Sequence, residues 1–313
     1  YTILKHLERE RSIEYSNDHI KSTLYRPFVI KHQYFDKDII DRQGKFEDLF
    51  KKSQKNRFLV FSNPATNVLF NIFGTDMIVD FNAFDSSQCI PLWKYDGEKN
   101  SNVTQYGLEL FQKHYKNKKI TDDDVFYYVY AMFNDPKYEE KYRYDLRRSL
   151  PRIPLAKNFE DWVKIGKSLF EIHCNFNGQQ EYGLKRIDKN VKENKIKLSF
   201  KEETQKNEKS KIRIILDDIT TLEDIPTEVL DYTFESKNPL WWILACYKEN
   251  KNFLTKNYSN DESFLKKFNT YKFEDHKEEV IILLNKVTTV CVETVKLRNE
   301  LREMDWGEQP KLE

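Results

Sequence analysis

A basic segment interrupted by two prolines, directly after an aromatic run, constrains this chain more than any other stretch. Residues 142–155 read YRYDLRRSLPRIPL, with prolines at Pro151 and Pro154. Proline fixes its own φ and biases the residue before it away from the helical region. The backbone is therefore expected to be extended at Leu150 and Ile153, and the segment must form a turn between two helices.

Helices are predicted on both sides of this turn. Thr121 is a suitable N-cap, and the three acids after it favour the positive end of a helix dipole, so a helix should run through Met132. A shorter helical pattern covers residues 138–146. Beyond the turn, residues 159–174 have apolar side chains at three- and four-residue spacing, which predicts an amphipathic helix. The turn therefore joins an aromatic helix to an amphipathic one.

The rest of the chain completes an α+β pattern. Short alternating or apolar runs between turn residues indicate a mixed sheet in the first hundred residues; they cover residues 25–40, 58–61, 77–81 and 89–95. Residues 195–200 and 211–216 alternate like the arms of a hairpin. Helical patterns follow at residues 225–234, 239–247 and about 275–304. We expect a mixed β-sheet domain with helices in its second half and a long C-terminal helical arm.

Three parts are expected along the chain. Residues 1–120 should form the mixed-sheet part, residues 121–235 the helical and hairpin part with the Pro-Arg-Ile-Pro turn, and residues 236–313 the helical arm. Charge is uneven although the net charge is only +1: residues 185–213 hold eleven Lys or Arg against five acids, while residues 214–235 hold seven acids and no Lys or Arg. Local clusters therefore matter more than net charge.

Composition limits the class of protein. Hydrophobic residues make up 39% of the chain, and only 8 glycines and 9 prolines are present, which is typical of a globular fold. The four cysteines are far apart, without a Cys-x-x-Cys pair, and are expected to be buried free thiols rather than a zinc site or disulfides. No apolar run is long enough to span a membrane, so a cytoplasmic protein is expected. The chain begins at Tyr1 without Met, which favours a fragment of a longer polypeptide.

Several short motifs also carry a resemblance. They are FYYVYAM at residues 126–132, YEEKY at 138–142, LPRIPL at 150–155, YRPF at 25–28, IPLWKY at 90–95, PTEV at 226–229 and PLW at 239–241. Their order and spacing along the chain, over nearly its whole length, resemble those of the C-terminal specificity region of type ISP restriction–modification enzymes and related adenine-specific DNA methyltransferases. One departure is Leu150, where the family favours Phe before the proline.

That resemblance implies a function. Enzymes of this family combine nuclease, helicase-like ATPase, adenine methyltransferase and target-recognition parts in one polypeptide. The chain would be the DNA target-recognition region, holding double-stranded DNA for N6-adenine methylation and ATP-dependent restriction by the methyltransferase and helicase-like domains, which lie outside it. It would have no catalytic activity and no cofactor of its own, because S-adenosylmethionine, ATP and Mg belong to the parent enzyme. No membrane partner is implied.

The residues suggest which side chains contact DNA. Arg can form paired hydrogen bonds with guanine edges and phosphates, and Arg147, Arg148 and Arg152 lie at a helix end and turn. Lys and Arg elsewhere can contact phosphates, and Asn or Gln can recognise adenine. The further candidates are Arg26, Arg42, Lys185, Arg186, Asn177 and Gln179. For each basic residue the alternative is an ordinary solvated surface, and for Arg26 it is an ion pair with Asp36 or Asp41.

Three other functions are alternatives to DNA recognition. A methyltransferase site lacks its glycine-rich loop. Two segments come near its base-binding motif, but Asn63-Pro64-Ala65-Thr66 lacks the aromatic residue and Asp135-Pro136-Lys137-Tyr138 lacks the second proline. A Mg-dependent nuclease could use Asp217, Asp218, Glu235 and Lys237 if these side chains converged. A protein-docking scaffold for the methyltransferase or motor domain is the other alternative. His173 and the tyrosines at 127, 128 and 130 are expected in the core.

Overall fold

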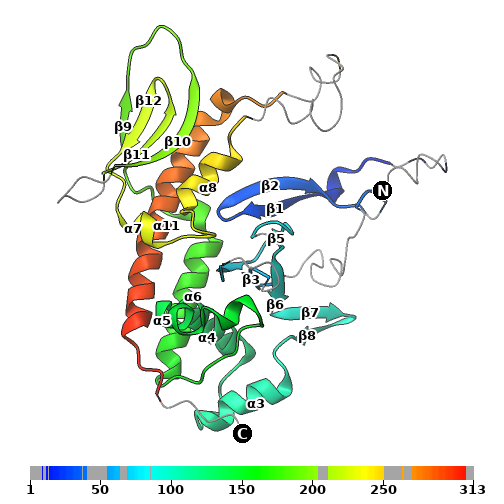
Figure 1. Cartoon of the computed structure of the whole chain (residues 1–313). Coiled ribbons are helices and arrows are strands. Elements are labelled where there is room, and N and C mark those ends of the chain that lie inside the picture. Colours follow the sequence, from blue (N-terminus) through cyan, green and yellow to red (C-terminus); the bar gives the residue numbers. More distant parts are fainter. Residues whose placement is uncertain are drawn as a thin grey trace. The chain divides into compact units, whose positions relative to one another are not determined.

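The computed structural model describes residues 9, 12, 14–36, 38–40, 55–63, 69–84, 86–203, 211–249, 263 and 270–307. The fold is α+β, as predicted (Figure 1). The chain divides into two compact units, the first comprising Tyr1–Asn175 with Lys296–Glu313 and the second comprising Phe176–Val295. Each unit has strands and helices of its own.

The described strands of the first unit form three small sheets. They are β1 (Ile20–Arg26), β2 (Val29–Tyr34), β3 (Phe58–Phe61), β4 (Ile72–Thr75), β5 (Ile78–Val79), β6 (Gln88–Pro91), β7 (Trp93–Asp96) and β8 (Glu98–Ser101). β1 pairs antiparallel with β2 and parallel with β5, so this sheet is mixed. β3 lies between β4 and β6 in an antiparallel sheet, and β7 pairs only with β8 among the described strands. The predicted strands are present, but they form separate small sheets.

The helices of the first unit begin at local signals in the sequence. Among the described residues they are α3 (Gln105–His114), α4 (Asp122–Asn134), α5 (Pro136–Tyr142) and α6 (Phe159–Cys174), with short 3-10 turns η1 (Asn17–His19) and η3 (Asp145–Arg147). The Thr121 hydroxyl caps α4 by accepting a hydrogen bond from the Asp124 N–H, and the Asp124 carboxylate accepts one from the Thr121 N–H at 2.8 Å. The predicted start of α4 and both ends of α6 are confirmed.

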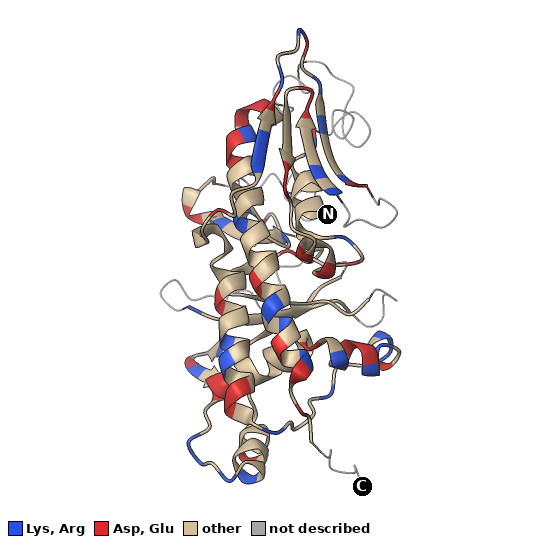
Figure 2. Ribbon diagram, turned by 90° about the vertical axis from the view of Figure 1, so that its left-hand side faces the viewer, with Lys and Arg blue, Asp and Glu red and all other residues tan. Residues whose placement is uncertain are grey.

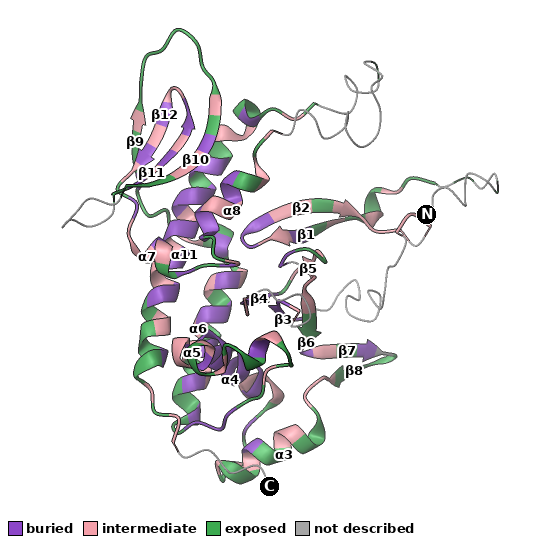
Figure 3. Cartoon of the chain, viewed as in Figure 1, coloured by how far each residue is buried: buried purple, intermediate pink, exposed green. Residues whose placement is uncertain are grey.

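The core of the first unit lies where α4 packs against α6 and β4. α4 is buried from Val125 to Asn134 (Figure 3), because neighbouring elements cover it on several sides. At Gly166 on α6, an added Cβ would lie 2.0 Å from the backbone oxygen of Tyr127 on α4. The two helices can approach this closely only because residue 166 has no side chain.

The second unit contains a four-stranded antiparallel sheet in the order β10-β11-β12-β9 (Figure 1). Its strands are β9 (Lys185–Asp188), β10 (Ile196–Glu203), β11 (Lys211–Asp217) and β12 (Thr220–Glu223). The predicted hairpin is β10 with β11, and their register pairs Lys201 with Arg213. The other elements are η4 (Phe176–Gly178), α7 (Glu228–Asp231), α8 (Pro239–Cys246) and η5 (Phe273–His276).

The C-terminal helix, α11 (Lys277–Glu303), has 27 residues, close to the predicted extent. Its residues up to Val295 belong to the second unit and the rest to the first. Within the described ranges, no helix is both long and apolar enough to cross a membrane. The helix expected over residues 225–234 is shorter, because only Glu228–Asp231 is helical and Phe234 pairs with Lys237 in a β-bridge.

The expectation of four buried thiols is wrong. Cys291 is buried, Cys174 and Cys246 are partly buried, and Cys89 is exposed. Cys89 lies on β6, one of the two edge strands of its sheet, and other elements cover this strand only in part. A short apolar run in the sequence does not reveal how far a strand is covered.

His173 on α6 is a buried member of the core, as expected. Its ring stacks on Phe73 with centroids 5.3 Å apart, and its Nδ1 is hydrogen-bonded to the Tyr130 hydroxyl. Burial, reinforced by the charge of Arg298, lowers the pKa of His173 to about 3. The imidazole is therefore neutral at physiological pH.

This lowered pKa predicts acid sensitivity. The unfolded chain takes up a proton on His173 as the pH falls through about 6.5, whereas the folded chain does so only near pH 3. The contribution of His173 to stability is therefore intact above pH 6.5 and is lost as the pH falls towards 3. Between pH 6.5 and 4.5 we expect the free energy of unfolding to drop by about 2 kcal/mol through this group.

Urea denaturation of the wild type and of His173→Phe at the two pH values would measure this effect. The Phe variant keeps an aromatic ring in the stack but cannot take up a proton. Its stability should fall less between the two pH values, even if it is lower at both. Equal falls in the two proteins would show that another group accounts for the acid sensitivity.

Candidate nucleic-acid interface

The proline segment lies between α5 and α6 as an exposed strip of backbone. After η3 ends at Arg147, the segment contains no helix or strand until α6 begins. Three large side chains stand out into solvent: Tyr144 is 80% exposed, Leu150 58% and Ile153 42%. We call residues 143–153 the arginine turn.

Tyrosine hydroxyls hold the backbone that follows this turn. The Tyr128 hydroxyl, on buried α4, donates to the carbonyl oxygen of Pro154 at 2.7 Å and accepts from the Ala156 N–H at 2.7 Å. The Tyr115 hydroxyl donates to the carbonyl oxygen of Ala156 at 2.7 Å. Each such bond stabilises the fold by about 1 kcal/mol. Together they fix the path of the chain where it enters α6.

A third hydroxyl reaches the turn itself. The Tyr138 hydroxyl on α5 donates to the carbonyl oxygen of Arg152 at 2.7 Å. Burial raises the pKa of Tyr138, so this hydroxyl keeps its proton at physiological pH and remains a donor. Because the bond goes to the backbone of Arg152, its guanidinium stays available to a ligand. The aromatic residues before the turn thus serve as its support.

The arginines of the turn have no acidic partner among the described residues. Arg143, Arg147, Arg148 and Arg152 form no ion pair with any described residue. Arg148 and Arg152 are exposed, and the Nε of half-buried Arg147 has no hydrogen-bond partner among the described residues. One acid, Asp145, lies in the turn. The turn therefore carries a surplus of positive charge that no described side chain neutralises.

Arg26, by contrast, is engaged in contacts within the protein. Its guanidinium donates to the carbonyl oxygen of Tyr25 at 2.8 Å and lies 3.8 Å from the Asp80 carboxylate. An ion pair was expected with Asp36 or Asp41. The partner is Asp80 instead, because β1 runs beside β5 and the chain that follows it, whereas Asp36 lies 2.9 Å from His19. Arg42 and Asp41 lie outside the described residues.

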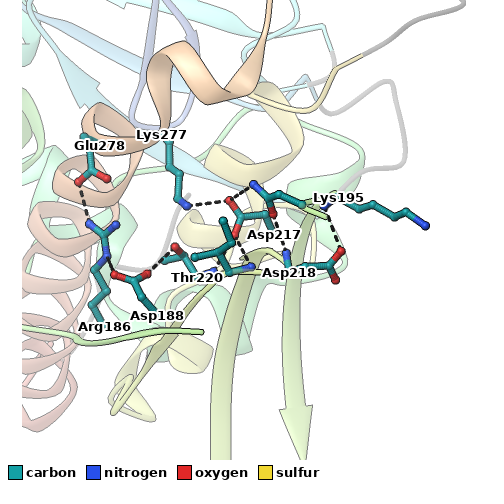
Figure 4. Close-up of polar contacts among 10 residues, drawn as sticks. Arg186, Asp188, Lys195, Asp217, Asp218, Thr220, Lys277 and Glu278 are labelled. Carbon is teal, nitrogen blue, oxygen red and sulfur yellow. Dashed lines mark hydrogen bonds and ion pairs between the residues drawn. The ribbon is translucent and has the colours of Figure 1, made fainter. Parts of the chain in front are cut away.

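The remaining candidates belong to the second unit. Lys185 is exposed on β9, whereas Arg186 is held between Asp188 and Glu278 at 2.8 Å each (Figure 4). The hydrogen bond with Glu278 raises the pKa of Arg186, and its guanidinium is engaged within the protein. Among these cations, Lys185 is the one left available.

Asn177 lies in η4 and Gln179 directly follows it, in a segment held by α11. The Lys286 ammonium donates to the carbonyl oxygen of Asn177 at 2.7 Å, and the Thr289 hydroxyl donates to that of Gln180 at 2.8 Å. The Asn177 side chain is exposed and that of Gln179 is half-buried. The segment is thus fixed through its backbone, which leaves the Asn177 amide facing solvent.

The acids proposed for a nuclease are engaged in structural contacts. Asp217 forms an ion pair with Lys277 at 2.7 Å and accepts from the Thr220 N–H at 2.6 Å (Figure 4). Asp218 pairs with Lys197 at 2.5 Å. Burial alone would raise the pKa of Asp217, but the hydrogen bonds from Lys277 and Thr220 bring it below its usual value. Both carboxylates are therefore ionised and already paired.

The other two nuclease candidates follow a different element. Glu235 and Lys237 lie in the β-bridged turn after α7, where the Lys237 ammonium sits 5.3 Å from the centre of the Trp241 ring. In the described part of the chain, no group of three or more His, Cys, Asp or Glu side chains could hold a metal ion. The nuclease interpretation finds no support.

Asp135, in the weak methyltransferase motif, has a structural role. It is the N-cap of α5, and its carboxylate accepts hydrogen bonds from the Lys137 N–H at 2.9 Å and the Trp306 indole at 2.8 Å. Burial raises its pKa. The Asp-Pro pair is thus explained as a helix start, where proline is favoured.

Two features of the arginine turn were not singled out from the sequence. Arg143 and Tyr144 also lie in it, exposed beside the expected arginines. The sequence pattern that could have identified them was present, because both residues belong to the basic and aromatic run YRYDLRRS. The hydroxyl bonds from Tyr115, Tyr128 and Tyr138 were not predictable, since they link segments that no sequence pattern connects.

Known proteins show clear similarity to this chain. A family model for the Type ISP C-terminal specificity domain matches residues 2–283. A solved cryo-electron microscopy structure of a DrdV–DNA complex is similar, with 32% sequence identity and a TM-score of 0.86, covering 96% of this chain and 30% of that chain. No curated protein matches the chain.

Two further solved structures are similar. One is the ATP-dependent Type ISP restriction-modification enzyme LlaBIII bound to DNA, with 26% identity and a TM-score of 0.74, covering 97% of this chain and 20% of that chain. The other is a nuclease-deletion mutant of the Type ISP enzyme LlaGI in complex with a DNA substrate mimic, with 25% identity and a TM-score of 0.71, covering 97% and 26%. The chain therefore spans less than a third of each of these solved chains.

Proposed function

The chain belongs to the family of Type ISP C-terminal specificity domains, and from this premise we propose that it is the DNA target-recognition region of a single-chain restriction–modification enzyme. In this role the arginine turn binds duplex DNA. The observation that carries the proposal is a set of four arginines without acidic partners on a backbone fixed by tyrosine hydroxyls. Guanidinium groups without acidic partners bind phosphates and guanine edges without first breaking an internal ion pair.

Within this proposal the residues have different roles. Arg148 and Arg152, both exposed, contact phosphates or guanine edges, and Arg147 supports them at the end of η3. Asn177 and Gln179 are candidates for adenine contacts from the second unit. Arg26 and Arg186 are engaged by acids, so they act on DNA only through the elements that they hold. Arg42 keeps its place as a candidate from the sequence alone.

The parent enzyme supplies the chemistry in this proposal. The chain holds duplex DNA while a methyltransferase domain of the same polypeptide methylates N6 of adenine with S-adenosylmethionine. A helicase-like domain using ATP and Mg carries out restriction when the site is unmodified. The chain itself contributes recognition and no catalytic group, and the enzyme works in the cytoplasm, where it meets incoming DNA.

A second candidate function is docking to those domains. The observation that favours it is the exposed apolar surface of the same turn, formed by Tyr144, Leu150 and Ile153. Exposed apolar side chains in a cluster mark interaction sites for proteins as well as for bases. In this alternative the arginine turn contacts the methyltransferase or motor domain, and another part of the enzyme reads the DNA.

Selection from a random pool separates the two candidates. The 313-residue chain would be incubated with random duplexes across a salt series, and the retained DNA would be sequenced. Enrichment of one short motif, with retention falling as salt rises, is expected for target recognition. If retention is salt-sensitive but no motif is enriched, the chain binds DNA phosphates and does not recognise a base sequence on its own. No retention at any salt would reject the proposal in favour of docking.

A further inference from the structure

One face of the four-stranded sheet in the second unit carries basic side chains that form no ion pair with the acids described in that unit. Strands alternate their side chains between two faces. On β11, Ile212, Ile214 and Leu216 are buried, while Lys211, Arg213 and Ile215 are exposed or half-buried. β12 alternates in the same way, with Thr220 and Leu222 buried. The sheet thus has one covered face and one open face.

The strand register places the open positions in rows. Ser199, Ile215, Thr221 and Ile187 are paired in turn across the four strands, and each is half-buried. Two residues further along, Lys201 pairs with Arg213, and Glu223 pairs with Lys185. Short and branched side chains therefore form the middle of the open face, with a mostly basic row beside them. We call these two rows the basic sheet face.

Acidic residues of the same sheet are mostly neutralised elsewhere. Asp188 pairs with Arg186 and Asp217 with Lys277 (Figure 4). Asp218 pairs with Lys197, so three carboxylates are matched by three cations. Arg213 pairs with Glu203 on the open face itself. Basic residues remain along the strands of this sheet (Figure 2).

Lys185 and Lys201 are the unneutralised cations of the basic sheet face. Both are exposed, and neither forms an ion pair with a described residue. They lie on the first and last strands of the order β10-β11-β12-β9, so three strand spacings separate them, roughly 14 Å at the usual distance between strands. Glu223, half-buried beside Lys185, is the one acid of these two rows.

We propose that the basic sheet face is a second DNA-binding surface, which holds the phosphate backbone of duplex DNA and reads no bases. The ligand follows from charge complementarity: two separated ammonium groups without an ion pair among the described residues lie at the two ends of the mostly basic row, beside a middle row without acids. An ammonium binds a phosphate as a point charge. Phosphate contacts add affinity without sequence information. This inference rests on the proposed function and adds to it a site outside the arginine turn.

The test compares charge reversals on and off this face in the whole chain. The variant Lys185→Glu/Lys201→Glu would be compared with Lys248→Glu/Lys272→Glu, which changes the charge equally at two exposed lysines of the same unit outside the sheet. Fluorescence anisotropy would follow binding to a labelled duplex from low to high salt. The sheet variant should bind at least about ten-fold more weakly than the control at moderate salt, because two phosphate contacts are lost.

A second double variant removes the two charges without reversing them, so its effect on folding should be smaller. For Lys185→Gln/Lys201→Gln, the slope of log affinity against log salt should fall by about two, since each phosphate contact contributes about 0.9. The sequence motif selected from the random pool should be unchanged, because phosphate contacts carry no sequence information.

Equal affinity in the sheet variant and its control would overturn this inference, and so would an unchanged salt slope in the Gln variant. Either result leaves the proposed function standing as long as the arginine turn variants lose binding. If no duplex binds the wild-type chain at any salt, the proposed function fails and this inference fails with it. The two failures are therefore distinguishable in one series of measurements.

Discussion

Reversing the charge of Arg148 and Arg152 together is expected to abolish detectable binding of duplex DNA by this chain at physiological salt. Both guanidinium groups are exposed and unpaired within the described residues. The double variant removes two charge-assisted contacts and places two carboxylates against phosphates. Losing a hydrogen-bonded charge contact costs about 1.5–3 kcal/mol for each group, so the combined effect should be on the order of a hundred- to ten-thousand-fold in affinity.

Two further variants make this result specific to the arginine turn. Lys94→Glu/Lys164→Glu changes the charge equally at two exposed lysines of the first unit, on β7 and α6, and should weaken binding only slightly. Arg148→Lys/Arg152→Lys keeps the charge but loses the paired hydrogen bonds of a guanidinium. It should keep salt-sensitive binding and lose sequence preference. If the charge-reversed chain still binds as the lysine control does, the arginine turn is not the DNA contact.

Replacing Gly166 by alanine should destabilise the first unit more than any exposed substitution. The new Cβ would stand 2.0 Å from the Tyr127 carbonyl oxygen and 3.1 Å from the Ala131 Cβ. The Tyr127 contact is with backbone, so no rotamer change relieves it and α4 has to move away from α6. Forcing atoms into a packed core costs about 1–3 kcal/mol and sometimes more, and we expect at least about 3 kcal/mol here.

Thermal or urea denaturation of Gly166→Ala beside Lys164→Ala would measure this cost. Lys164 lies on the exposed side of the same helix, and its replacement should change stability by no more than about 0.5 kcal/mol. If the two alanine variants are equally stable, α4 and α6 are not held as closely as their contact at Gly166 requires.

The sequence was sufficient for features that depend on neighbouring residues. The capping box at Thr121, the spacing of apolar residues in α6 and the length of α11 are local, so these helices begin and end close to where they were expected. The prolines at 151 and 154 likewise indicate an extended backbone by themselves. The helix expected over residues 225–234 is shorter because the β-bridge at Phe234 competes with it, and the composition of the segment does not show that contact.

Pairing between distant segments was beyond the sequence. The partner of Arg26 is Asp80 rather than Asp36, because the choice depends on how β1 and β5 meet. For the candidate DNA-binding site, the sequence identified three of the arginines and the proline-containing turn in which they lie. It gave no reason why Arg186 would be engaged by Glu278 on α11 while Arg148 has no acidic partner. That difference depends on which acids the fold brings near each cation.

Hydrogen bonds to backbone carbonyls hold the arginine turn, and this has a consequence for how its preference for DNA can change. The carbonyls of Arg152, Pro154 and Ala156 remain in place whatever side chains those residues carry. Residues 148, 150, 152 and 153 can therefore be exchanged while the path of the chain stays the same. Such a frame suits the diversification of recognition sites, and a library randomised at these four positions is a direct route to altered specificity.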